Sequence, residues 1–114
     1  MTPRTLKALR GSIEKWQKIV IGKGTDYGYR NCPLCKEFLN RDAIYDRQCD
    51  GCPVVNVTRK SSCIGTPYDD EWIDLAEVHN ICELGQKAIT HAQRKAALSE
   101  LLFLESLLPK RTRK

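Results

Sequence analysis

Two C-x-x-C pairs constrain this chain more than any other feature of its sequence. Cys32 and Cys35 form the first pair, in CPLC, and Cys49 and Cys52 form the second, in CDGCPV. The thirteen residues between the pairs are enough to bring the second pair back to the first. Each pair of this kind makes one tight turn that offers two thiolates to a tetrahedral ion. The spacing therefore predicts a structural Zn²⁺ site with these four cysteines as ligands.

Two further cysteines lie outside the pairs. Cys63 follows Cys52 by eleven residues, and this spacing allows it to be an alternative or additional ligand, or a small apolar filler. Cys82 falls on a pattern of helical periodicity, and we expect it to pack in the core.

Other uses of paired cysteines fit the chain less well. An iron–sulfur cluster also takes four thiolates, but two tight pairs suit a single ion better. Thiol redox chemistry of the thioredoxin type needs a C-x-x-C within a βαβ pattern, which the sequence lacks. A site closed by four thiolates leaves no open position for catalysis, and no phosphate-binding or nucleophile motif occurs. We therefore expect a protein that is not an enzyme.

The N-terminal stretch MTPRTLKALRGSIEKW has no apolar region of the kind that a signal peptide needs. The most apolar run, LSELLFLESLLP, is about half the length of a membrane span. These features favour a cytoplasmic protein without a membrane segment. In a reducing compartment disulfides do not persist, so the six cysteines point to metal rather than to cross-links.

Apolar periodicity predicts a mostly α-helical single domain over residues 1–114. A stripe at spacings of three and four predicts an N-terminal helix over residues 1–22, and a small irregular zinc-bound module should occupy residues 23–65. Thr66 and Pro67 are typical of a helix start, followed by three acidic residues. We predict a long helix or helical hairpin over residues 66–108, against which the short N-terminal helix packs, and a basic tail over 109–114. The helical stripe comprises Leu6, Leu9, Ile13, Trp16 and Val20, and the predicted seam of the long helix comprises Leu75, Val78, Cys82, Gly85, Ile89, Ala92 and Ala96.

Leucines surround most of the circumference of the C-terminal segment. One neighbouring helix cannot cover all of them. Either the zinc module or a folded-back half of the same helix covers the remainder, or the excess forms a homodimer contact or a docking surface for a protein partner. The residues of this predicted interaction surface are Leu98, Leu101, Leu102, Leu104 and Leu108.

Net charge of +5 and a loop that interleaves tyrosines with basic residues also allow nucleic-acid binding. The simpler alternative is that the tyrosines pack on the cysteine module and the basic residues only meet solvent. The candidate contact residues are Lys23, Tyr27, Tyr29, Arg30, Arg59 and Lys60.

The segments CPLC, CDGCPV and CIGTPYDDEW, following a helix of the form LRGSIEKWQKIV, resemble a recurrent type of small protein from tailed bacteriophages and prophages. The resemblance covers residues 6–75 and implies an accessory protein with a metal-bound cysteine module, in which Cys63 belongs with the other cysteines. It brings no assigned activity. Because short phage accessory proteins often bind and redirect host proteins, it suggests a non-enzymatic, zinc-stabilised protein that binds another protein, for example to inhibit a host or defence complex. A nucleic-acid-binding zinc module is the alternative, followed by a thiol-redox or iron–sulfur protein.

Overall fold

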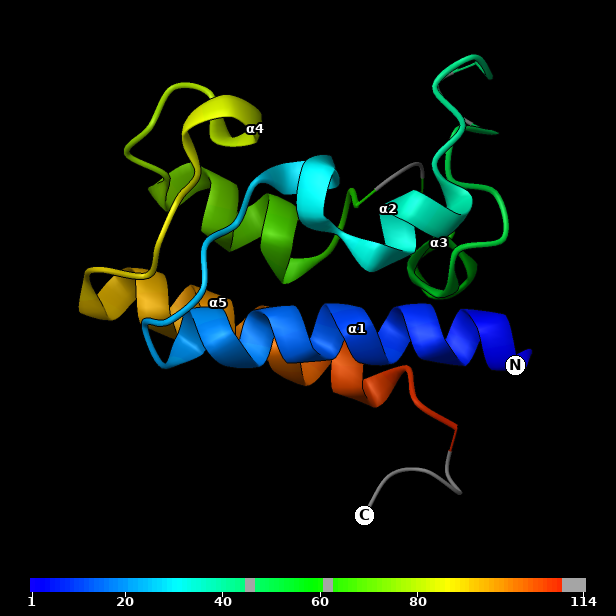
Figure 1. Cartoon of the computed structure of the whole chain (residues 1–114), viewed down its shortest axis with the longest axis horizontal. Coiled ribbons are helices and arrows are strands. Elements are labelled where there is room, and N and C mark those ends of the chain that lie inside the picture. The colour runs from blue at the N-terminus through cyan, green and yellow to red at the C-terminus, as the bar shows by residue number, and fades with distance from the viewer. Residues whose placement is uncertain (45–46, 61–62, 110–114) are drawn as a thin grey trace.

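The structure is a computed structural model that describes residues 1–44, 47–60 and 63–109, and helices dominate it (Figure 1). Within these ranges there is no β-strand, and Asp26 and Gln86 form one isolated antiparallel bridge. The mostly helical fold class is thereby confirmed. The elements in chain order are α1 (Pro3–Val20), η1 (Gly28–Asn31), α2 (Pro33–Phe38), α3 (Pro53–Thr58), η3 (Tyr68–Trp72), η4 (Ile73–Leu75), α4 (Ile81–Leu84) and α5 (His91–Ser106).

Helix α1 forms where the apolar stripe predicted it. Thr2 is its N-cap, and the Thr2 hydroxyl accepts a hydrogen bond from the Thr5 amide at 3.1 Å. Pro3 occupies the first turn, where its missing N–H costs nothing. The helix ends before Gly22, whose φ of 81° turns the chain out of the helical path.

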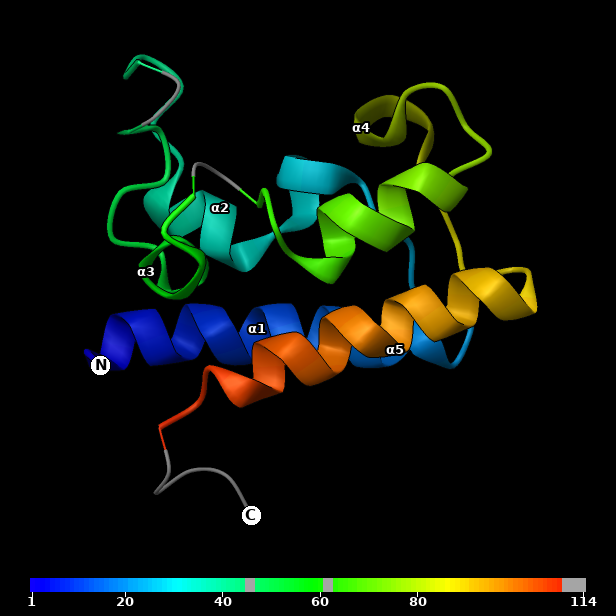
Figure 2. The same cartoon turned by 180° about the vertical axis from the view of Figure 1, so that it is seen from behind.

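Helix α5 lies antiparallel along α1, as both views of the fold show (Figures 1 and 2). Alanines on α5 let the two helices approach closely, and larger apolar side chains fill the remaining space. This packing of the N-terminal helix on a C-terminal helix confirms the predicted arrangement. The buried apolar residues of the two helices are Ala8, Leu9, Ile13, Trp16 and Ile19 on α1, and Ala96, Ala97, Leu101 and Leu104 on α5.

The predicted continuous helix or hairpin over residues 66–108 is wrong. The chain breaks it into η3, η4, α4 and α5, because helix stop and start signals outweigh the periodicity. Gly85 ends α4 with a φ of 76°, and Thr90 starts α5 with a capping box completed by Gln93. Asn80 caps the start of α4, where its side-chain oxygen accepts from the Glu83 amide at 3.3 Å.

The predicted seam of the long helix is wrong for the same reason. Leu75 and Ile89 are exposed, and Cys82, expected in the core, is only half-buried. Ala96 is buried because it belongs to α5 and faces α1. The apolar pattern at spacings of three and four extends over residues 76–80 and 85–90, which are not helical, so it does not mark one helix face there.

The start of the predicted helix at Thr66 is correct in place but not in detail. The turn η3 has Pro67 as its N-cap, and Thr66 lies one residue earlier, fully buried. Its hydroxyl donates to the Cys63 carbonyl at 2.7 Å and accepts from the Asp69 amide at 3.4 Å. Thr66 therefore joins the Cys63 turn to η3.

The elements η1, α2, η3 and η4 form a second layer over α1 (Figure 2). Helices α2 and α3 lie near the N-terminal end of α1, whereas α4 lies toward its other end. Trp72 joins the layers by meeting Trp16 edge to face, with ring centroids 5.2 Å apart. The segments that carry the two C-x-x-C pairs therefore sit at one end of the molecule, whereas α4, which carries Cys82, lies toward the other.

A buried carboxylate holds the second layer together, and we call this arrangement the Asp26 network. Asp26 is fully buried and accepts three hydrogen bonds, from the Lys15 ammonium at 2.8 Å, the Gly28 amide at 2.8 Å and the Trp72 indole N–H at 2.9 Å. Its backbone pairs in both directions with Gln86 at 2.9 Å. Each polar group in the network has a partner within the chain.

Candidate metal centre

Five cysteines line one pocket, with a cavity of about 40 Å³. They come from three stretches of chain: the start of α2, the start of α3 and the turn before η3. The structure thus brings both predicted pairs together and adds Cys63, which spacing alone left open. We name this site the cysteine pocket. Its cysteines are Cys32, Cys35, Cys49, Cys52 and Cys63, and the other lining residues are Ser12, Trp16, Leu34, Val54, Glu100 and Leu104.

Cys32 and Cys35 are positioned by the start of α2. Cys32 is the N-cap, and its sulfur accepts a hydrogen bond from the Cys35 amide at 3.3 Å. Pro33 fills the first helical position and packs on Gly11 of α1, where a Cβ would lie only 3.0 Å from the proline ring. Close contact with α1 therefore fixes this pair against the core.

Cys49 and Cys52 are positioned by a similar device at the start of α3. Cys52 is the N-cap and Pro53 follows it, as Pro33 follows Cys32. Gly51 has a φ of 88°, which the tight turn between the two cysteines requires. Both cysteines are buried, with 9% and 7% of their surface exposed. Cysteine and proline at a helix start thus recur in the two pairs.

The two thiols of the first pair shift each other's pKa in opposite directions. A hydrogen bond from the Cys35 thiol, helped by the charge of Lys15, lowers the pKa of Cys32 to about 6. The same bond raises the pKa of Cys35, because Cys35 must keep its proton to donate it. The two cysteines therefore titrate as a pair, in which Cys32 is favoured as the thiolate and Cys35 as the thiol.

Three further groups of the pocket, Cys52, Cys63 and Glu100, are destabilised as anions. Burial raises the pKa of Cys52 to about 11, and it also raises the pKa of Cys63. Glu100 of α5 lines the same pocket, and burial raises its carboxyl pKa to about 8, against one hydrogen bond from the Tyr68 amide at 3.1 Å. Cys32 is thus favoured as a thiolate in this pocket, whereas Cys52, Cys63 and Glu100 are favoured in their protonated forms.

Sequence reasoning missed Glu100. The residue stands among the leucines of the C-terminal segment, and its position three residues after Ala97 and four after Ala96 was the available signal. Those alanines face α1, so Glu100 lies on the same buried side of α5. A charged residue on a buried helix face usually has a partner or a function.

The side chains of the cysteine pocket do not form a coordination sphere in this structure. Within residues 1–44, 47–60 and 63–109, no group of three or more His, Cys, Asp or Glu side chains is arranged to hold a metal ion. The donor chemistry nevertheless suits Zn²⁺, which binds thiolates in tetrahedral sets of four. A shared ion requires the thiols, which already line one cavity, to turn inward.

The residues predicted to contact nucleic acid are exposed, but the two tyrosines among them also contact other residues of the chain. Lys23, Arg30, Arg59 and Lys60 are exposed, and so is Tyr29. The Arg41 guanidinium lies over the Tyr29 ring, 5.0 Å from its centroid, so this ring is partly used within the chain.

Tyr27 is also exposed, but its ring edge lies against Gly85, where a Cβ would come within 2.7 Å of it. Glycine at that position lets the α4 segment approach the tyrosine loop. Both loop tyrosines thus have contacts within the chain and retain some open surface.

The predicted leucine surface divides into two halves. Leu101 and Leu104 are 8% and 2% exposed and belong to the core, so their assignment to an interaction surface is wrong. Both belong to the hydrophobic core cluster, and Leu104 also lines the cysteine pocket. Leu98 and Leu102 are 42% and 57% exposed and stay uncovered, and Leu108 is half-buried against the core.

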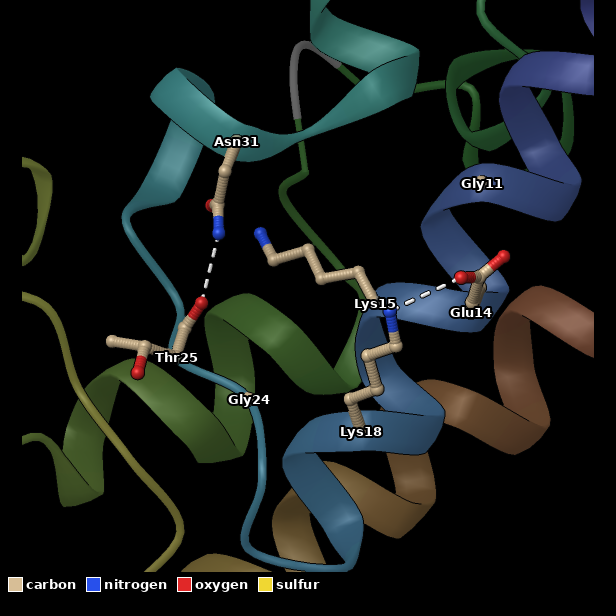
Figure 3. Close-up of a pocket in the computed structure, with 7 residues that line it drawn as sticks. All are labelled: Gly11, Glu14, Lys15, Lys18, Gly24, Thr25 and Asn31. Carbon is tan, nitrogen blue, oxygen red and sulfur yellow. Dashed lines mark hydrogen bonds and ion pairs between the residues drawn. The ribbon is translucent and has the colours of Figure 1, made fainter.

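A second, polar pocket lies between α1 and the loop that follows it (Figure 3). Its volume is about 270 Å³, and Lys18 and Glu14, one turn apart on α1, pair at 3.1 Å along one of its walls. Asn31 donates to the Thr25 carbonyl at 2.8 Å, as the dashed line in Figure 3 marks. Lys15 extends toward the same loop and pairs with Asp26. The cations of this pocket are therefore matched by acids of the chain.

No family model, curated protein or solved structure matches the chain. Among the helices of residues 1–44, 47–60 and 63–109, none is both long and apolar enough to cross a membrane.

Proposed function

We propose that the chain is a non-enzymatic, zinc-stabilised accessory protein that acts by binding another protein. The observation that carries the proposal is the gathering of five cysteines from three stretches of chain around one cavity. Five thiols in one small pocket are more than packing needs, and a structural zinc site would use four of them as ligands.

The ligands in this proposal are the two C-x-x-C pairs, Cys32 with Cys35 and Cys49 with Cys52. In each pair one cysteine is the N-cap of a short helix, and a proline follows that cysteine directly. Bound Zn²⁺ would hold the short helices α2 and α3 to α1 and α5. Its role is structural, since four thiolates leave no open position for a substrate.

Binding of a protein partner is supported by the outer face of α5. Leu98 and Leu102 stand one helical turn apart and are exposed, with Arg94 and Lys95 beside them. The resemblance to phage accessory proteins makes a host protein the partner that we propose, with inhibition of a host or defence complex as the outcome.

The metal content of purified protein tests the proposal. We expect about one zinc per chain by elemental mass spectrometry, and no zinc in the double variant Cys35→Ser, Cys49→Ser. Cys82→Ala is the matched control, because Cys82 lies outside the cysteine pocket. Zinc retained in the double variant, or iron with sulfide in the wild type, would contradict the assignment.

Nucleic-acid binding is the second candidate, and the exposed Tyr27 and Tyr29 beside Lys23 and Arg30 favour it. An electrophoretic mobility-shift assay over a salt series separates the two candidates. Phosphate contacts by these side chains would give affinity that falls steeply with salt, and Lys23→Ala with Arg30→Ala would reduce the slope. A protein-binding role gives no specific shift.

A further inference from the structure

No element of the described chain covers the outer face of α5. The helix packs on α1 and η3 through its opposite side, where Ala97 and Leu101 are buried. Figure 2 shows α5 on the near side of the molecule, and no described segment passes in front of it. Leu98 and Leu102 stand one turn apart on the outer face, with 42% and 57% of their surface exposed. These two leucines form a short apolar stripe that meets solvent, and we call it the leucine stripe.

Opposite charges flank the leucine stripe along the helix. Arg94 precedes it and is exposed, and Glu105 follows it and is half-buried. Glu105 lies eleven residues after Arg94, which is close to three whole turns, so both lie on the same flank of the stripe. Lys95 is rotated by about 100° from Arg94 and lies on the other flank. Within residues 1–44, 47–60 and 63–109, neither Arg94 nor Glu105 forms an ion pair.

This face is complementary to itself when one copy of the helix is reversed. The midpoint between Arg94 and Glu105 and the midpoint between the two leucines differ by half a residue, about 0.8 Å along the helix. A second copy that lies antiparallel, related by a two-fold axis at that point, therefore places its Leu102 against Leu98. Such an axis also brings the same flank of both helices together, so Arg94 of each copy faces Glu105 of the other. A parallel copy would instead place arginine against arginine and glutamate against glutamate.

We propose that the outer face of α5 is a self-association surface, on which a second copy of this chain binds antiparallel with Arg94 of each copy paired to Glu105 of the other. Two leucines from each copy bury less area than the roughly 1,200 Å² of a standard interface, so the dimer is weak and reversible. We expect a dissociation constant on the order of 100 µM, which leaves single copies at the low concentrations of an unfolding titration. A partner protein that uses this face must displace the second copy. That competition rests on the proposed function, whereas the dimer itself does not.

Analytical ultracentrifugation of the full chain, from roughly 5 to 500 µM, tests this pairing. We expect the mean mass of the wild type to rise from one chain toward two. Arg94→Glu and Glu105→Arg should each weaken association about tenfold, because the symmetry turns two attractive pairs into two repulsive ones. Neither change opposes the dipole of α5. Arg94→Glu also lowers the positive net charge by two, which weakens the general repulsion between copies.

Two further samples should restore the pairing. An equimolar mixture of Arg94→Glu and Glu105→Arg places unlike charges at both contacts, so it should associate as strongly as the wild type. A single chain that carries both changes should do the same. Lys95→Glu is the matched control, because it makes the same charge change on the flank that faces Ser106 of the second copy. It should change association by less than about threefold. Circular dichroism checks that each variant keeps its helices.

A wild type that keeps the mass of one chain at roughly 500 µM would end the inference, and so would charge-reversed variants that associate like the wild type. Failure of the mixture to recover association, or an equal effect of Lys95→Glu, would show that the arginine–glutamate pairs do not hold the copies together. Zinc content is measured separately. A monomeric wild type with about one zinc per chain overturns this inference and leaves the proposed function standing, whereas a dimer without zinc contradicts the proposed function alone.

Discussion

The Asp26 network and the cysteine pocket are both buried, and both join α1 to the second layer, but they are completed in different ways. Asp26 receives a cation and two N–H donors, all from the chain itself. Glu100, the carboxyl group of the cysteine pocket, receives the Tyr68 amide and forms no ion pair within the part of the chain that the structure describes.

The two buried sites differ in what makes them stable. A buried charge is tolerated when a partner and hydrogen bonds compensate it, as at Asp26. In the cysteine pocket, burial raises the pKa of Cys52, Cys63 and Glu100, so their ionised forms are unfavourable. The Asp26 network is complete with groups of the chain itself. We propose that Zn²⁺ completes the cysteine pocket.

Among single substitutions, we expect the greatest loss in the free energy of unfolding at Asp26. Asp26→Ala leaves the Lys15 ammonium buried without its partner and the Trp72 N–H without an acceptor. We expect a loss of about 4 kcal/mol in the free energy of unfolding, measured by urea titration. The exposed Asp70→Ala should change it by less than about 0.5 kcal/mol. If Asp26→Ala costs no more than this control, the network does not hold the layer.

Gln93 is a second buried polar residue whose partners all come from the chain itself. Its side-chain oxygen accepts from the Ile89 and Thr90 amides at 2.9 Å, and its nitrogen donates to the Leu75 carbonyl at 3.0 Å. Gln93→Ala leaves these backbone groups unpaired, at a cost of about 2 kcal/mol in thermal or urea unfolding. His91→Ala, on the exposed side of the same helix turn, is the control. Equal stability of the two variants would contradict this role for Gln93.

At the cysteine end, Thr66→Ala removes the hydroxyl that holds the Cys63 turn. We expect a loss of about 1 kcal/mol in the free energy of unfolding, because one hydrogen bond and one capping contact disappear. Thr66→Ser keeps the hydroxyl and should retain most of the stability. A serine variant as unstable as the alanine variant would show that the methyl group, and not the hydrogen bond, matters here.

The smallest effect on stability should come from the exposed leucines of α5. Leu98→Glu with Leu102→Glu should change the free energy of unfolding by less than about 0.5 kcal/mol, since both side chains meet solvent. The same pair of changes at Leu101 and Leu104 should unfold the protein, because those side chains are core. Light scattering gives the mass, and copurification from the natural host gives partner capture. Unaltered mass and capture in the folded double variant would exclude this face as the interface.

Sequence reasoning found the features that are local. The stripe of α1, its cap and the two C-x-x-C turns depend on neighbouring residues, and a periodic pattern or a fixed spacing reports them directly. We could also predict that the two pairs lie close together, because one Zn²⁺ ion takes four thiolates.

Features that depend on distant contacts were not accessible in this way. The break at Gly85 lets the chain pair Gln86 with Asp26, sixty residues away, and a helical pattern contains no sign of that pairing. The burial of Leu101 against the exposure of Leu102 depends on where α1 lies. The position of Cys63 in the pocket depends on the Thr66 turn, which spacing does not describe.

Amide hydrogen exchange by NMR, with Zn²⁺ and after chelation, tests the contrast between the two ends most directly. The Lys36 and Asn56 amides, bonded to the carbonyls of Cys32 and Cys52 at 3.0 Å, report the cysteine end, and the paired amides of Asp26 and Gln86 report the other. We predict that chelation lowers the protection of the first two by about 100-fold or more and leaves the second two protected. Equal loss at all four amides, or no loss at any, would contradict the account.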